Sequence, residues 1–353
     1  MELGLLLAGG GGLPVDDLAD LARRGEAAGF GGMYVPESWR SGFVPVAAVA
    51  HATSHVKVGP YVLNAHARTP LAAGMSAVDL DQLASGRLVL GVGSGNHVMN
   101  ESGHGVPVVR PLAKMRDYVE VVRQITRAPI GEPVNHSGSI HSITDWKPQA
   151  DPLRASIPVL LAATAPRMME LAAEVADGIA LGALQSAEFV DEISGRARER
   201  SPLGDDFDVH CAAMVAVDDD GDRARGRARR AVVDLFALKP HPHYERLLRL
   251  QGHSEVADNL LASIAAHDLE GAAAALPDEV VTSLVVAGTP AECAAQVARF
   301  ETSVDTLVLV NVAAMQQVSA GVPAPTTSHE LVGSYDSLFT LADAVRSGAE
   351  HVA

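Results

Sequence analysis

The sequence predicts an α/β protein with the architecture of a (β/α)₈ TIM barrel. Short β-rich runs alternate with longer helical patterns along the 353 residues, and about eight such pairs can be counted. The run Arg87–Val92 is almost continuously apolar, as is typical of a parallel strand that helices cover on both faces. A barrel of eight strand–helix pairs takes about 250 residues without insertions, so this length also allows for some.

The first half of the chain contains four of these pairs. Strands are expected at Glu2–Leu7, Gly32–Val35, Val56–Leu63 and Arg87–Val92, and helices at Asp16–Ala28, Val44–Thr53, Thr69–Ser85 and Pro111–Arg127. The last helix is the clearest, because apolar residues recur in it at helical spacing: Leu112, Met115, Val119, Val122 and Ile125.

The second half repeats the alternation. Strands are expected at Ile157–Ala162, Gly178–Leu181, Phe207–Val217 and Asp305–Val312, and helices at Pro166–Ala176, Asp222–Phe236, Pro290–Phe300 and His329–Ser347. Two stretches interrupt the rhythm. Residues 128–156 follow the fourth strand, and the helical stretch 239–277 follows the seventh. We predict both as insertions in a single domain that spans residues 1–353.

Composition excludes several classes of protein. The chain has 27 basic and 43 acidic residues, a net charge of −16, which argues against binding to a nucleic-acid backbone. No apolar run reaches the roughly 18 residues that span a bilayer, and no basic region precedes the N-terminal apolar run as in a signal peptide. Two cysteines without CxxC spacing indicate a reduced, cytoplasmic chain. We find no spaced metal-ligand motif and no G-x-S-x-G elbow.

Two turns that follow strands are suited to an anion. The run Gly91-Val92-Gly93-Ser94-Gly95-Asn96 is not the dinucleotide fingerprint, but its glycines allow backbone N–H groups to approach a phosphate. In Ala162-Ala163-Thr164-Ala165-Pro166, Thr164 is a suitable N-cap and the helix start can bind an anion. Each turn alone is better explained as a plain strand-to-helix connection, whereas the two together fit one phosphate better than either alone.

Candidates for acid–base chemistry lie in the loops after the second, third and fourth strands. Glu37 is suited to hold a cofactor ring N–H or hydroxyl, or is a solvated carboxylate. His66, His97 and His104 are candidate proton donors, although any one of 14 histidines can be incidental. A basic cluster in the second insertion either holds an acidic substrate group or is a solvated helix start: Lys239, His241, His243 and Arg246.

At this point the sequence resembles the bacterial luciferase-like superfamily, a set of (β/α)₈ flavin and deazaflavin oxidoreductases. The similar segments occur in order along most of the chain: Gly25–Phe30, Gly59–Val62, Arg68–Pro70, Gly86–Gly95, Ala162–Pro166, Glu170–Gly178, Ala287–Pro290 and Val304–Val310. Within the superfamily, Gly59–Asn64 followed by Arg68-Thr69-Pro70 is similar to the branch that uses the deazaflavin coenzyme F420.

The resemblance implies how that cofactor is bound. Ser94, Gly95 and Ala163–Ala165 would hold its phosphate, and Tyr61 and Val62 would support its ring at a non-prolyl cis peptide bond. The full set of cofactor-binding residues expected is Glu37, Ser38, Pro60, Tyr61, Val62, Asn64, Gly93, Ser94, Gly95, Asn96, Ala163, Thr164, Ala165 and Pro166.

The chain departs from one branch member at its acid and base. Where the deazaflavin-type glucose-6-phosphate dehydrogenase has an Asp-His pair after the second strand, this chain has Glu37-Ser38, and Asn96 replaces an acid after the phosphate glycine. The chemistry of that enzyme is therefore not carried over. We rank Glu37, His97 and His66, in that order, as proton donors.

These observations predict an F420-dependent oxidoreductase that transfers a hydride to or from a small organic substrate with a C=C, C=N or C=O bond. A reduced-FMN monooxygenase of the same fold is the nearest alternative, and a barrel that has lost its cofactor is the third. We expect a cytoplasmic homodimer without nucleic-acid or membrane partners.

Overall fold

The computed structural model describes residues 1–7, 13–38, 40–237, 242–319 and 327–350. The chain divides into two compact units. Unit 1 consists of Met1–Gly32, Gly182–Gly195 and His210–Ala353, and unit 2 consists of Met33–Leu181 and Arg196–Val209. Lys239 and His241 of the basic cluster lie outside the described residues. The expectation of a single domain stays a prediction.

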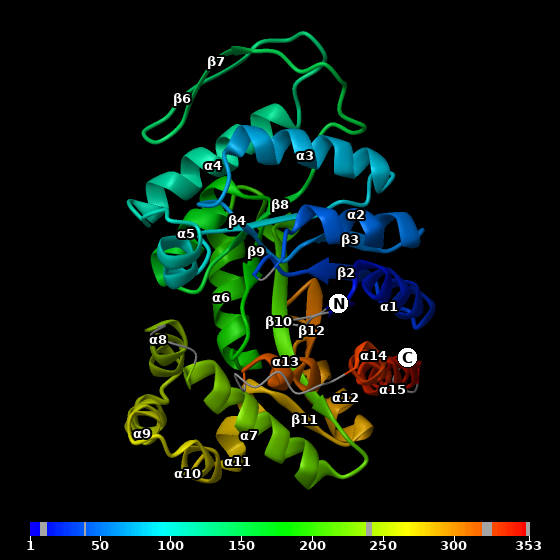
Figure 1. Ribbon diagram of the computed structural model, residues 1–353, viewed down its shortest axis with the longest axis vertical. Helices are drawn as coiled ribbons and strands as arrows, with labels where there is room; N and C mark the ends of the chain where they lie inside the picture. Colours follow the sequence, from blue (N-terminus) through cyan, green and yellow to red (C-terminus); the bar gives the residue numbers. More distant parts are fainter. Residues whose placement is uncertain (8–12, 39, 238–241, 320–326, 351–353) are drawn as a thin grey trace. The chain divides into compact units, whose positions relative to one another are not determined.

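Unit 1 contains a parallel sheet in the order β1 (Glu2–Leu6), β12 (Thr306–Asn311), β10 (Asp208–Val217) and β11 (Val286–Gly288). In register, Leu5 and Ala213 both pair with Leu309. These strands are built from buried aliphatic side chains, as expected of parallel strands. The helices of unit 1 are α1 (Val15–Ala27), α7 (Gly221–Ala237), α8 (Pro242–Leu250), α9 (Ser254–Ala265), α10 (Leu269–Ala274), α11 (Asp278–Leu284), α12 (Pro290–Ala298), α13 (Val312–Ser319), α14 (Ser328–Gly333) and α15 (Asp336–Glu350) (Figure 1).

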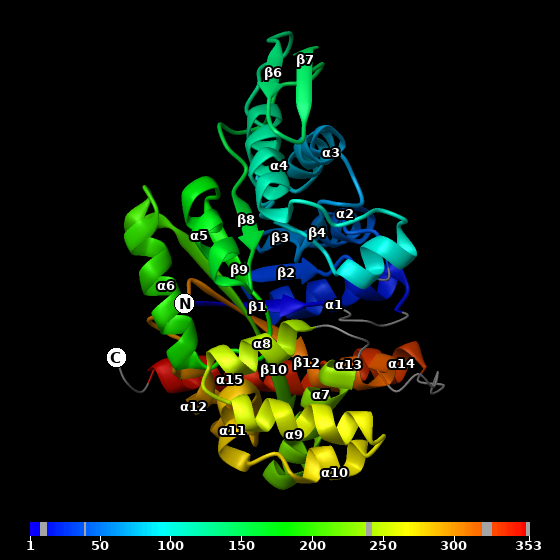
Figure 2. The ribbon, with the colours of Figure 1, turned by 90° about the vertical axis from the view of Figure 1, so that its left-hand side faces the viewer.

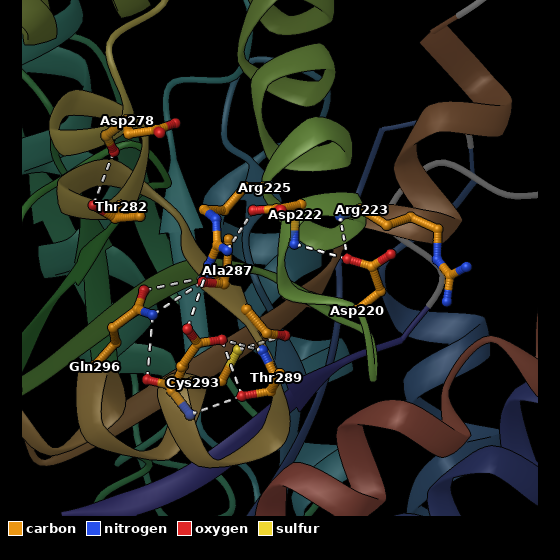
Figure 3. A network of polar contacts seen from close by, with 12 residues as sticks. Asp220, Asp222, Arg223, Arg225, Asp278, Thr282, Ala287, Thr289, Cys293 and Gln296 are labelled. Carbon is orange, nitrogen blue, oxygen red and sulfur yellow. Dashed lines mark hydrogen bonds and ion pairs between the residues drawn. The ribbon is translucent and has the colours of Figure 1, made fainter.

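Side chains fix the turn from β11 into α12 (Figure 3). Thr289 and Glu292 form a capping box, in which Glu292 accepts the Thr289 N–H at 2.7 Å. The amide of Gln296 accepts the N–H of Ala287 at 3.1 Å and donates to its carbonyl at 3.0 Å. Arg225 on α7 pairs with both Asp222 and Glu292. The strand, its helix and α7 are therefore tied together by polar contacts as well as by apolar packing.

Unit 2 contains the strands that carry the candidate site. Parallel strands run in the order β4 (Leu63–Asn64), β5 (Leu90–Gly93), β8 (Val159–Ala162) and β9 (Gly178–Leu181), and β3 (Lys57–Pro60) lies beside β2 (Gly32–Val35). The accompanying helices are α2 (Phe43–Ala52), α3 (Pro70–Leu83), α4 (Pro111–Ile125), α5 (Pro166–Val175) and a π-helix at Met99–Gly103. Beside α4 is a hairpin of β6 (Val134–Ser137) and β7 (Ser142–Trp146) (Figure 2).

Most predicted strands and helices agree with the structure to within a few residues, and the differences have local causes. The predicted strand Val56–Leu63 is two strands, because a cis peptide bond lies between Tyr61 and Val62, as the resemblance implies. The last predicted helix is two, α14 and α15. Thr164 is not the N-cap of α5: that residue is Ala165, and no side chain caps the helix.

The two predicted insertions contain regular elements of their own. Residues 128–156 contain the hairpin β6–β7, and the described part of 239–277 contains α8, α9 and α10. Helix α6 (Ala187–Arg200) was not predicted. No helix in the described parts of the chain combines the length and apolarity that crossing a membrane requires.

Candidate active site

Unit 2 contains a cavity of about 550 Å³ where its parallel strands end. The lining segments follow β2, connect β3 to β4, and follow β4 and β5. Active sites of α/β barrels lie at this end of the strands. The lining residues are Pro36, Glu37, Ser38, Arg40, Ser41, Tyr61, Val62, Asn64, Ala67, Arg68, Gly95, Asn96, Met99 and His104.

An ion pair between Glu37 and Arg68 forms part of the lining. The Arg68 nitrogens donate to the two carboxylate oxygens at 2.8 and 2.5 Å. The same oxygens accept the backbone N–H groups of Gly42 at 3.0 Å and Asn64 at 2.7 Å. The side chains are 10% exposed for Glu37 and 21% for Arg68. Glu37 therefore ties together three segments of the cavity wall.

A chain of amide side chains supports the turn after β5 from behind. Asn64 Nδ2 donates to Asn100 Oδ1 at 2.6 Å, and Asn100 Nδ2 donates to the Ser94 carbonyl at 2.9 Å. Both amides are buried, and Asn100 is fully so, within the π-helix. Buried amides that satisfy each other in this way hold a loop in one conformation.

The turn Ser94–Asn96 has the backbone of an anion site. Gly95 has φ +64°, and a Cβ there would come within 2.5 Å of Asn64 Oδ1, so this position requires glycine. In the described part of the chain, no acceptor takes the backbone N–H of Ser94, Gly95 or Asn96. Consecutive free N–H groups beside a residue with positive φ form an anion-binding concavity.

The start of α5 follows the strand next to this turn. Val92 of β5 pairs in parallel with Leu161 of β8, so Ser94 and Ala163 leave neighbouring strands at the same edge. The Ala163 N–H donates to the Ala180 carbonyl at 3.2 Å, and Pro166 begins the helix. A phosphate shared by the two turns remains a prediction.

The cavity gathers half of the residues that the sequence analysis names for the cofactor. Glu37, Ser38, Tyr61, Val62, Asn64, Gly95 and Asn96 line it. Pro60, Gly93 and Ser94 are their chain neighbours but do not line it, nor do Ala163, Thr164, Ala165 and Pro166. Tyr61 is oriented by its hydroxyl, which donates to the Leu181 carbonyl at 2.8 Å.

Two of the three candidate histidines, His97 and His66, do not line the cavity, whereas His104 does. His97 is exposed. His66 is 5% exposed, and within the described residues neither of its ring nitrogens has a hydrogen-bond partner. Burial, and then the charge of Lys114, lower the pKa of His66. Its imidazole is therefore neutral at neutral pH.

Two residues of the site, Arg68 and Asn100, were not selected from the sequence, and His104 was named there but not ranked as a proton donor. Arg68 belongs to the motif Arg68-Thr69-Pro70, which was a signal for it. His104 is in a loop after β5 and lines the cavity. Asn100 gave no signal, because its role depends on contacts with Asn64 and Ser94 that only folding brings about.

Comparison with known proteins gives the family. The profile of the family described as luciferase-like monooxygenase matches residues 1–307. The chain belongs to this family. Two relatives with assigned names are each 30% identical to it. One, from Mycobacterium tuberculosis, is named "putative coenzyme F420-dependent oxidoreductase" and matches over 90% of this chain and 97% of its own. The other is the 5,10-methylenetetrahydromethanopterin reductase of Archaeoglobus fulgidus, with 75% and 80% coverage.

A solved structure of similar fold supports the architecture. The coenzyme F420-dependent tetrahydromethanopterin reductase of Methanopyrus kandleri superposes with a TM-score of 0.74 at 22% identity, covering 95% of this chain and 96% of that protein. The chain is an α/β protein with the TIM-barrel-like luciferase fold, which confirms the predicted fold class. Members of this family are oxidoreductases, and the named relatives indicate its F420 branch.

Proposed function

We propose that this chain is a coenzyme F420-dependent oxidoreductase that transfers a hydride between the deazaflavin and a small organic substrate with a C=C, C=N or C=O bond. The observation that carries the proposal is the composition of one cavity. Tyr61 and Val62, which are joined by the cis peptide bond, line it together with Gly95 of the turn Ser94–Asn96. Two relatives at 30% identity support this cofactor over FMN. One has F420 in its name, and the other is a reductase related to the solved reductase that is named as F420-dependent.

The residues present fit such a cofactor. An elongated ligand with a ring and a phosphate needs an apolar support for the first and hydrogen-bond donors for the second. Val62 and Tyr61 offer the support, and the unpaired N–H groups of Ser94, Gly95 and Asn96 are donors for the phosphate. When bound, the deazaflavin supplies the hydride chemistry.

The protein supplies position, exclusion of water and a proton. Glu37 and Arg68 fix the segments after β2 and β4, and Asn64 with Asn100 fixes the turn after β5. A cavity whose walls are held at these points keeps its shape when a ligand enters.

The proton for a reduced substrate requires an acid in the cavity. Among its lining residues, the titratable ones are Glu37, Arg40, Tyr61, Arg68 and His104. Four N–H groups, from Gly42, Asn64 and Arg68, donate to Glu37. The Tyr61 hydroxyl already donates to the Leu181 carbonyl, and guanidinium groups are poor acids. We therefore propose His104 as the proton donor, ahead of Glu37, His97 and His66.

Cofactor titration tests the proposal. Purified protein is titrated with F420 and with FMN, each oxidised and reduced, and binding is read from quenching of cofactor fluorescence. Saturable binding of F420, with FMN at least tenfold weaker, is the expected result. Preference for FMN would instead favour a reduced-FMN monooxygenase, and binding of neither would favour a barrel without a cofactor.

A further inference from the structure

The hairpin β6–β7 is attached to α4 by one apolar and one polar contact region. In the apolar region, Val134 and Ile143 pack with Val121 and Ile125 of the helix. In the polar region, Asp117 Oδ2 accepts the N–H groups of Ile140 at 2.6 Å and His141 at 3.1 Å. Figures 1 and 2 show the hairpin beside α4. The carboxylate of Asp117 thus holds the turn of the hairpin.

Three ligand-type atoms converge at this polar contact. Asp117 and Glu120 on α4 and His136 on β6 each present one carboxylate oxygen or ring nitrogen, and these atoms all lie within 4.8 Å of one another. The two acids are three residues apart and so share one helix face. Their like charges repel, and a cation bound between them would remove that repulsion.

The imidazole of His136 is oriented for coordination. Its Nε2 is buried, and no hydrogen-bond partner reaches it in the described part of the chain. Its Nδ1 lies 3.4 Å from Gln124 Nε2, one turn beyond Glu120. Coordination through Nε2 requires the proton on Nδ1, and Gln124 accepts that proton through Oε1 once its side-chain amide is turned over.

Glycine keeps the space between two of these ligands clear. A Cβ at Gly138 would come within 2.3 Å of Asp117 Oδ2 and 2.5 Å of His136 Nε2. Any side chain at this position would therefore occupy the gap between carboxylate and imidazole. Oxygen and nitrogen ligands bind transition ions at about 2.0–2.2 Å, and glycine at position 138 keeps a side chain from crowding the two ligand atoms that would contact the ion.

We propose that Asp117, Glu120 and His136 bind one divalent transition-metal ion of the zinc class. One imidazole and two carboxylates suit Zn²⁺ and its neighbours rather than Ca²⁺, which takes oxygen ligands alone. The ion neutralises the two acids and fastens the hairpin to α4. The ligands come from a helix and from a strand 16 residues further on, which explains why no spaced motif in the sequence indicates the site.

Metal titration of the full chain tests this site directly. Protein freed of metal with EDTA and then of chelator is titrated with ZnCl₂ by calorimetry, and with CoCl₂ by visible absorption. Trp146, which pairs with Val134 in the hairpin, reports the event by fluorescence in a Trp39→Phe background, since the chain has two tryptophans. One equivalent bound, with cobalt ligand-field bands and a change in Trp146 emission, is expected.

Variants separate this site from adventitious binding. Glu120→Gln and His136→Gln should each weaken Zn²⁺ binding by about tenfold or more, since even indirect partners of a metal contribute that much. The matched control is Glu132→Gln, an exposed acid that follows the same helix, which should bind as the wild type does. Absence of binding, or equal affinity in all four proteins, would overturn the proposal. Neither measurement depends on the F420 assignment.

Discussion

Glu37 and Arg68 form a two-point ion pair in the cavity lining, and both oxygens of the carboxylate accept backbone N–H groups as well. Arg68 is also stacked near the Phe43 ring, with its guanidinium carbon 5.2 Å from the ring centre. A carboxylate surrounded by four donors is suited to fix structure, whereas a proton donor needs an acceptor to share its proton with. That Glu37 is a proton donor stays a prediction, which the variant Glu37→Gln tests.

Glu37→Gln should lower the free energy of unfolding by about 2 kcal/mol, somewhat less than the 3–5 kcal/mol typical of breaking a fully buried pair. The cause is an Arg68 guanidinium left without its anion, and the cost is reduced because Arg68 is 21% exposed. Urea unfolding measures it, with the exposed Glu101→Gln as control. A variant of wild-type stability with abolished turnover would instead identify Glu37 as a proton donor.

Gly95→Ala should weaken cofactor binding, and Gly95→Val should weaken it further. Position 95 has a positive φ, and its Cβ would displace the Asn64 amide that supports the turn. Gly103→Ala is the matched control, because a Cβ there meets nothing within 4 Å. Fluorescence titration with F420 gives the affinities, and thermal unfolding checks that the fold is retained. Equal affinities for the three variants and the wild type would show that the turn does not bind the cofactor.

His104→Gln should reduce turnover by about 10²-fold or more while leaving cofactor affinity within a factor of two or so, as is typical of losing a general acid. The comparison variants are His97→Gln and His66→Gln, whose side chains do not line the cavity. Steady-state rates for each are measured once a substrate has been found by screening. If His97→Gln lost the most turnover, the proton would come from outside the observed cavity lining.

Acidification should destabilise the fold, and part of this loss should depend on His66. The pKa of His66 in the folded protein is below its ordinary value of 6.5, so the unfolded chain takes up a proton first as the pH falls. Stability is therefore full above pH 6.5 and decreases below it. Denaturant unfolding between about pH 7 and pH 5 measures the slope, which should be shallower in His66→Leu than in the wild type.

The predicted pH dependence belongs to His66, and two charged groups near it also affect its pKa. Lys114 and His97 are the charged neighbours that lower its pKa along with burial. The control is His51→Gln, an exposed histidine of α2, and its pH slope should match that of the wild type. An unchanged slope in His66→Leu would mean that the acid sensitivity arises elsewhere.

The pattern of apolar residues predicts most strands and helices, but it does not predict which polar groups contact one another. Runs such as Leu88–Leu90 indicate buried strands because burial on both faces leaves a continuous apolar signal. The hairpin β6–β7 has no such signal, because its strands hold few apolar residues: Val134 in β6, and Ile143 and Trp146 in β7. In α6, Val190, Ile193 and Ala197 are buried at helical spacing, and this pattern was present in the sequence.

In the candidate active site, too, the positions of residues could be predicted better than their polar partners. The segments after β2, β4 and β5 line one cavity, as expected of parallel strands that end at one edge, whereas Ala163–Pro166 after β8 do not line it. The partners of Glu37 could not be predicted, since Gly42, Asn64 and Arg68 reach it only through the fold. His97 and His104 are seven residues apart in one loop, and only the conformation of the π-helix between them determines which lines the cavity.

The lining of the cavity extends only from Pro36 to His104, within a single continuous stretch of the chain. A pocket whose lining comes from one continuous stretch of the chain is encoded by one continuous stretch of the gene. A single recombination event on either side of it can transfer the whole pocket to another barrel, with the Glu37–Arg68 and Asn64–Asn100 pairs kept together. Selection can then vary distant segments without separating partners that depend on each other.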